Sequence, residues 1–126
     1  MDWSIEIKID GEVLVAAVDG GLNVKGYVAA REKVRSALEK SRAQCVLFDI
    51  RRAVLYLTTM DVFEVAASNS QVIPPSTPCA VVFSSGTMSM RDARFGEDVA
   101  RNRGACLKAF TDIAKAKHPL PRGERE

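Results

Sequence analysis

Polar side chains follow two short apolar runs, at positions where a parallel strand would end. Asp49, Arg51 and Arg52 come directly after Cys45–Phe48, and Ser84-Ser85-Gly86-Thr87 comes directly after Ala80–Phe83. In open α/β sheets, ligands bind beyond the carboxyl ends of the strands, so these connections are the first place to look for function. None of them has the GxxxxGK[ST] spacing of a phosphate-binding loop.

Two adjacent hydroxyls, Thr58 and Thr59, are predicted to open a helix shortly after the arginines. The free N–H groups and the dipole of a helix N-terminus favour negative charge, so this segment could bind an anion or accept a phosphate. The alternative is that the arginines are solvent-exposed and that one threonine only caps the helix.

The residues between the arginines and the threonines, Val54-Leu55-Tyr56-Leu57, form an apolar stretch in a predicted surface connection. Exposed apolar loops mark protein interfaces or ligand clefts, although this loop could also fold back onto the following helix. We therefore expect the functional contact to lie within residues 51–63. The predicted interaction or anion site consists of Arg51, Arg52, Tyr56, Thr58, Thr59, Ser84 and Ser85.

Catalytic and metal-binding arrangements are not predicted. The only histidine, His118, stands beside Pro119 near the end of the chain, so neither a Ser-His-Asp nor a Cys-His arrangement can be assembled. The acidic residues show no spacing that selects an acid–base pair. The three cysteines are too far apart in sequence for a zinc site, and we predict no metal and no cofactor.

Composition sets broader limits. The 18 basic and 16 acidic residues leave a net charge of +2, which predicts no general affinity for nucleic acid. No apolar stretch approaches the ~18 residues of a membrane span, and the N-terminus lacks the pattern of a signal peptide. Together with Cys45, Cys79 and Cys106, which we expect to be reduced and mostly buried, this predicts a cytoplasmic protein.

The hydrophobic pattern predicts an α/β domain over residues 1–118 and a flexible C-terminal tail over 119–126. Alternating residues 3–9, a turn at Asp10-Gly11 and an apolar run at 13–18 predict an antiparallel hairpin. Strands at 45–50, 80–83 and 105–110 should be parallel, with helices from about residues 23–40, 58–69, 89–103 and 112–117. The resulting order is β-β-α-β-α-β-α-β-α, a mostly parallel sheet with helices packed on it.

This order, and several segments in it, resemble the SpoIIAA-like branch of the STAS fold. The segment WSIEIKIDGEVLVAAVDG is similar to that branch's opening strands and CVLFDIRR to its third strand. CAVVFSS and RDARFGEDVARNRGACLKAFTD are similar to its last strand, helix and strand, so the resemblance spans roughly residues 3–118.

The resemblance implies an anti-anti-sigma type of switch, in which a partner kinase phosphorylates a Ser at the helix after the third strand. Residues 49–59 lack the Asp-Ser-Ser-Gly sequence usual there, which argues against that switch in its common form. The fold's relatives also include lipid-exchange domains of the Sec14 type, so the fold does not select the ligand.

We therefore expect a non-enzymatic interaction or regulatory domain with a protein partner, a second copy of the chain included. The alternative is a domain that binds a small apolar or anionic molecule, or a lipid, in the cleft at the carboxyl ends of the strands.

Overall fold

The computed structural model describes residues 2–117 and shows one five-stranded sheet with the strand order β1-β2-β3-β4-β5. β1 (Trp3–Asp10) and β2 (Val13–Leu22) are antiparallel, and β3 (Cys45–Leu55), β4 (Cys79–Val82) and β5 (Leu107–Phe110) extend the sheet in parallel. The α/β class and the antiparallel edge hairpin predicted from the sequence are confirmed. Residues 118–126, on which the predictions about His118 and the tail fall, lie outside the described part.

The N-terminal half follows the predicted pattern. Gly11 has a φ of 63°, a left-handed conformation that favours glycine, and it forms the hairpin turn. Helix α1 (Val24–Glu39) begins after Asn23, whose side-chain oxygen accepts a hydrogen bond of 2.8 Å from the Gly26 N–H. Asn23 is therefore the N-cap that the sequence predicts.

Strand β3 is longer than predicted, because it continues past Ile50 to Leu55. Its pairing with β2 shifts between Ala17 and Asp19, where β3 has one extra residue. This bulge directs both Ile50 and Ala53 into the core. It also places two consecutive arginines outside the core, and that pair interrupts the alternation by which a strand is recognised in sequence. The predicted surface connection was therefore wrong for residues 51–55, which belong to the strand, whereas Tyr56 and Leu57 do lie in the connection after it.

The second crossover contains two helices, α2 (Thr59–Ala67) and the short α3 (Asn69–Val72), and three prolines follow before β4. The helical spacing of the apolar residues predicts an inner side of α2 formed by Val62, Phe63, Ala66 and Ala67. These residues are only partly buried, and the buried residue of α2 is Val65.

Helix α4 (Met90–Asn102) starts at the cap Ser89, and Gly104, with a φ of 93°, follows its end as predicted. Its inner side is formed by Ala93, Val99 and Ala100, while Phe95 lies at the surface and stacks on Phe63 of α2 with ring centroids 6.4 Å apart. The spacing of one turn between Phe95 and Val99 predicts that both lie on the inner side of α4. For Phe95 this prediction is wrong, because its turn of α4 lies beside α2 and not over the sheet.

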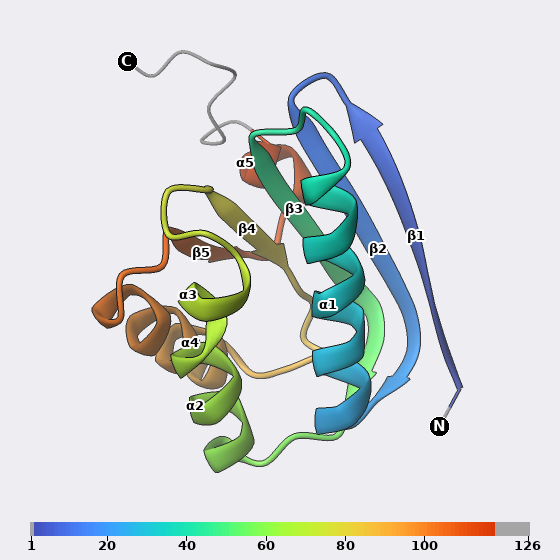
Figure 1. Ribbon diagram of the computed structural model, residues 1–126. Coiled ribbons are helices and arrows are strands. Elements are labelled where there is room, and N and C mark those ends of the chain that lie inside the picture. The colour runs from blue at the N-terminus through green and yellow to red at the C-terminus, as the bar shows by residue number, and fades with distance from the viewer. Residues whose placement is uncertain (1, 118–126) are drawn as a thin grey trace.

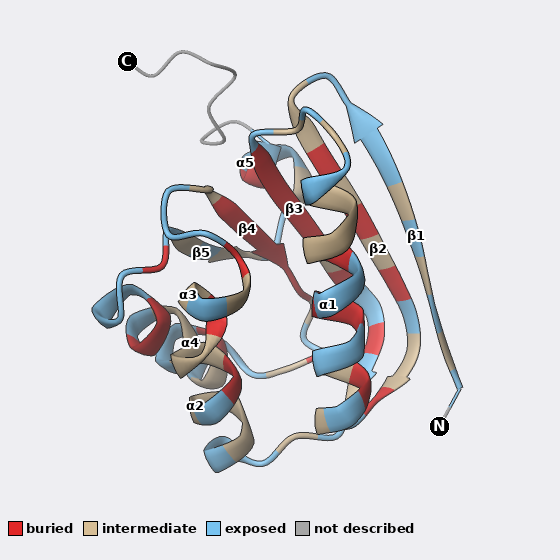
Figure 2. Ribbon diagram, in the orientation of Figure 1, coloured by how far each residue is buried: buried red, intermediate tan, exposed pale blue. Residues whose placement is uncertain are grey.

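The helices form two layers of unequal size (Figure 1). Helices α1 and α4 pack with the larger core on one face of the sheet, next to α2 and α3, and α5 (Ile113–Lys117) packs on the other face through Ala116. Figure 2 shows that β3 and β4 are almost wholly buried over their first halves, whereas β1 is exposed along much of its length. The edge strand β5 is protected by Glu97, whose carboxylate accepts the Ala109 N–H at 2.9 Å.

No disulfide joins the three cysteines within residues 2–117, and two of the three are buried as the sequence predicts. Cys45 and Cys79 are buried on opposite faces of the sheet, and burial raises the pKa of the Cys79 thiol to about 12. Cys106 is exposed, contrary to the prediction, because β5 begins one residue later and Cys106 belongs to the turn before it.

Candidate functional site

The edge formed by the carboxyl ends of the parallel strands contains the polar residues predicted from the sequence. Asp49 and Arg51, both on β3, form a bidentate ion pair in which Nε and Nη2 of the arginine lie 2.9 and 2.8 Å from the two carboxylate oxygens. Burial raises the pKa of Asp49, but the hydrogen bonds and the charge of Arg51 outweigh it and leave this pKa below its usual value. Because its charge is paired, Arg51 is less suited to hold an anion than the sequence suggested.

The hydroxyls of the β4–α4 connection contact the middle of β3, next to its bulge. The Thr87 hydroxyl is buried and donates to the Ile50 carbonyl at 3.0 Å, and the Ser84 hydroxyl lies 3.2 Å from the Arg51 carbonyl. The two hydroxyl oxygens are 2.9 Å apart. Ser84 thus has a structural role in fixing the edge, whereas Ser85 next to it is exposed.

The two predicted hydroxyls at the start of α2 differ in role. Thr58 is the N-cap, and with Asp61 it forms a reciprocal capping box: its oxygen accepts the Asp61 N–H at 3.1 Å, and its own N–H donates to the Asp61 carboxylate at 2.9 Å. The Asp61 carboxylate already occupies the position where the free N–H groups would attract an anion. Thr59 is exposed, and no hydrogen bond of its side chain is found within residues 2–117.

Large apolar side chains are exposed along the same edge. Tyr56 has 56% and Met60 has 63% of its surface exposed. Thr59 lines a shallow groove together with Phe95 of α4, so the starts of α2 and α4 are neighbours. We call the exposed set the docking surface, and its residues are Arg52, Val54, Tyr56, Thr59, Met60 and Phe95.

Of the seven residues predicted from the sequence, the structure leaves Arg52, Tyr56, Thr59 and Ser85 exposed, and it engages the other three in local contacts. The side chains of the apolar stretch 54–57 point alternately inward and outward, because the stretch belongs to β3 and to the segment that continues it. Leu55 packs against the core and Leu57 lines a cavity, while Val54 and Tyr56 face outward.

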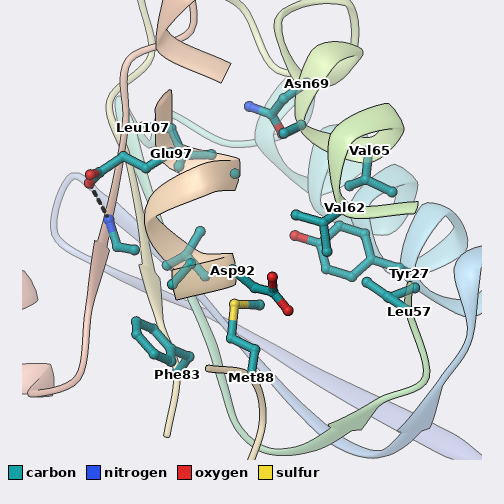
Figure 3. Close-up of a pocket in the computed structure, with 15 residues that line it drawn as sticks. Tyr27, Leu57, Val62, Val65, Asn69, Phe83, Met88, Asp92, Glu97 and Leu107 are labelled. Atoms are coloured by element: carbon teal, nitrogen blue, oxygen red, sulfur yellow. Dashed lines mark hydrogen bonds between the residues drawn. The ribbon is translucent and has the colours of Figure 1, made fainter. Parts of the chain in front are cut away.

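A cavity of about 60 Å³ lies between the helical layer and the sheet (Figure 3). Its walls are mostly apolar and come from α1, α2, α4, β4, β5 and the connections after β3 and β4. The cavity therefore lies under the helices, and only Leu57, Phe83 and Met88 connect it with the strand-end edge where the sequence placed a ligand cleft. A second cavity of about 20 Å³ adjoins it and shares Tyr27, Asn69, Val81 and Leu107 with its walls.

Three polar side chains, Tyr27, Arg31 and Asn69, line the smaller cavity, and none of them is predicted from the sequence as functional. Arg31 is only 7% exposed and donates to the Val65 carbonyl and the Ser68 hydroxyl at 2.8 and 3.1 Å, but its Nε is buried without a partner among the described residues. Burial lowers the pKa of Arg31 and raises that of Tyr27 to about 12. The spacing in the sequence does indicate that Arg31 is buried, because it lies four residues after Tyr27 and three before Val34, on the helix face that meets the core.

Other kinds of site find no support within residues 2–117. No group of three or more His, Cys, Asp or Glu residues is placed there to hold a metal ion. In the same residues, no helix has both the length and the apolar character to cross a membrane.

Two solved structures resemble this one over most of their length. A protein described as an anti-sigma factor antagonist from Mycobacterium paratuberculosis superposes with a TM-score of 0.66 at 13% sequence identity, covering 94% of each chain. An uncharacterised DUF3478-family protein with a SpoIIAA-like fold from Shewanella loihica gives a TM-score of 0.57 at 16% identity, also covering 94% of each chain. No family model matches the sequence, and no curated protein sequence matches it. The fold is therefore SpoIIAA-like, as the sequence resemblance implied.

Proposed function

We propose that this SpoIIAA-like chain is a non-enzymatic regulatory domain that binds a protein partner through the docking surface. The observation behind the proposal is the concentration of exposed apolar side chains at one edge of the molecule. Of the seven large hydrophobic residues that are exposed in residues 2–117, five come from the short segments 54–60 and 90–95. Exposed apolar groups that gather in this way are typical of protein interfaces.

The chemistry of the edge supports a protein partner. Tyr56 and Met60 are side chains that commonly anchor interfaces, since each offers a large apolar area. Arg52 adds a charge that no ion pair engages within the described residues, and such a group at the rim can select a partner of complementary charge. The fold agrees with this proposal, because one structure that shares it is described as an antagonist of another regulatory protein.

A non-enzymatic role is consistent with how the polar groups of the edge are used. The Asp49 carboxylate is held by Arg51, and the hydroxyls of Ser84 and Thr87 are directed at backbone carbonyls. None of these groups is placed as a nucleophile beside a base, which covalent catalysis would require.

The proposal is tested by affinity capture with quantitative mass spectrometry from the native cells. Tyr56→Ala and Met60→Ala should lose a protein that wild type retains, and Val28→Ala should retain it. Val28 is a matched control, because it is also an exposed hydrophobic residue but lies on α1, outside the docking surface. Recovery of the same proteins at the same levels from all variants would contradict the proposal.

A further inference from the structure

The two adjoining cavities differ in chemistry although they share part of their walls. The larger one is lined mainly by side chains such as Val62, Phe83 and Met88, and its charged residues, Asp92 and Glu97, come from α4. The smaller one is lined by Tyr27, Arg31 and Asn69 together with apolar residues, and no carboxylate contributes to its walls.

The polar groups of the smaller cavity have hydrogen-bonding capacity that the described residues do not use. Asn69 is only 8% exposed and its side chain has no hydrogen bond within residues 2–117, nor has the Tyr27 hydroxyl. Figure 3 shows the Tyr27 hydroxyl and the Asn69 amide, which line both cavities, directed from α1 and α3 toward the larger one. In the wall of the smaller cavity, the Nε of Arg31 is the polar atom that is buried without a partner among residues 2–117. Such a group is costly, so the arrangement favours a molecule that supplies the missing partner.

The charge of the wall indicates the kind of partner. Arg31 is buried, makes no ion pair within residues 2–117, and donates only to a carbonyl and a hydroxyl. A buried cation without an anion is unfavourable, and a carboxylate would both neutralise it and accept its remaining N–H groups. The Tyr27 phenol stays protonated near neutral pH, because burial raises its pKa to about 12, and so it is also a donor.

We propose that the two cavities together bind a small monocarboxylic acid, with its carboxylate where the cavities meet, facing Tyr27, Arg31 and Asn69, and its apolar tail in the larger one. A site for one water-sized group needs about 10–15 Å³. The volumes of about 60 and 20 Å³ thus accommodate about five to eight non-hydrogen atoms between them, which corresponds to a carboxylate with a tail of about two to five carbon atoms. This site is separate from the docking surface and does not depend on the proposed partner.

The experiment is a titration of the full chain with hexanoate, followed by isothermal titration calorimetry and by amide NMR shifts. The neutral analogue 1-hexanol is titrated in parallel. We expect saturable binding of hexanoate at least about tenfold tighter than that of the alcohol, because charge-assisted hydrogen bonds are the stronger ones. The amide shifts should concentrate at Tyr27, Asn69 and Val81.

Two tyrosine variants separate the proposed site from unspecific binding. Tyr27→Phe removes only a hydroxyl and should weaken hexanoate binding about five- to tenfold, the effect of one lost hydrogen bond. Tyr56→Phe makes the same change on the docking surface and should bind as wild type does. The proposal is overturned if hexanoate does not saturate, if 1-hexanol binds equally well, or if Tyr27→Phe binds like wild type.

Discussion

The Thr87 hydroxyl joins the β4–α4 connection to the middle of β3, and its removal should destabilise the fold by a measurable amount. Thr87→Val keeps the shape of the side chain but removes the donor that lies 3.0 Å from the Ile50 carbonyl. Thr87 is only 6% exposed, so water cannot readily replace the lost bond. A buried acceptor left without its donor costs about 1–3 kcal/mol, and we expect the free energy of unfolding to fall by about 2 kcal/mol.

Urea denaturation followed by circular dichroism measures this change. The same loss should lower the melting temperature by about 8 °C, taking about 4 °C per kcal/mol for a chain of this size. Thr59→Val is the matched control, because the exposed Thr59 side chain has no hydrogen bond in the described structure, and it should stay within about 0.5 kcal/mol of wild type. Equal stabilities of the Thr87 variant and wild type would refute the structural role given to this hydroxyl.

Three further results are expected. Thr58→Ala should lower the free energy of unfolding by about 1 kcal/mol in urea titrations, since it removes one half of the capping box. Cys106 should react with a thiol reagent in the native protein while the two buried thiols react only in denaturant, which mass spectrometry of labelled peptides can check. Arg51→Gln should lower stability at neutral pH by raising the pKa of Asp49. The pKa of Asp49 is lower in the folded state than in the unfolded state, so its ionised form stabilises the fold at pH values above the unfolded pKa. The difference in the free energy of unfolding between wild type and variant should therefore disappear as the pH falls through the folded pKa of Asp49. The same dependence of stability on pH in both proteins would contradict this prediction.

Local patterns in the sequence predict most of the fold. The hairpin, the cap at Asn23 and the cap at Thr58 each depend on residues close together in the chain, and all three are confirmed. The length of β3 depends on a bulge against β2, and the sequence of β3 alone gives no sign of its register with another strand. For that reason the segment after Ile50 was taken for a loop.

The candidate site was predicted in part. The edge that holds Arg52 and Tyr56 follows from where the parallel strands end, and their exposure agrees with a surface role. The cavity could not be predicted, because it depends on how closely α2 and α4 approach the sheet. Arg31 was not identified from the sequence, although its position on α1 places it toward the core.

The central claim, that a protein partner binds the docking surface, is tested most directly by photo-crosslinking in the native cells. A photoreactive amino acid replaces Tyr56 in one variant and Val28, on α1, in the other. We predict one defined crosslinked protein from position 56 and none from position 28. No crosslinked protein from position 56, or the same protein from both positions, would contradict the claim.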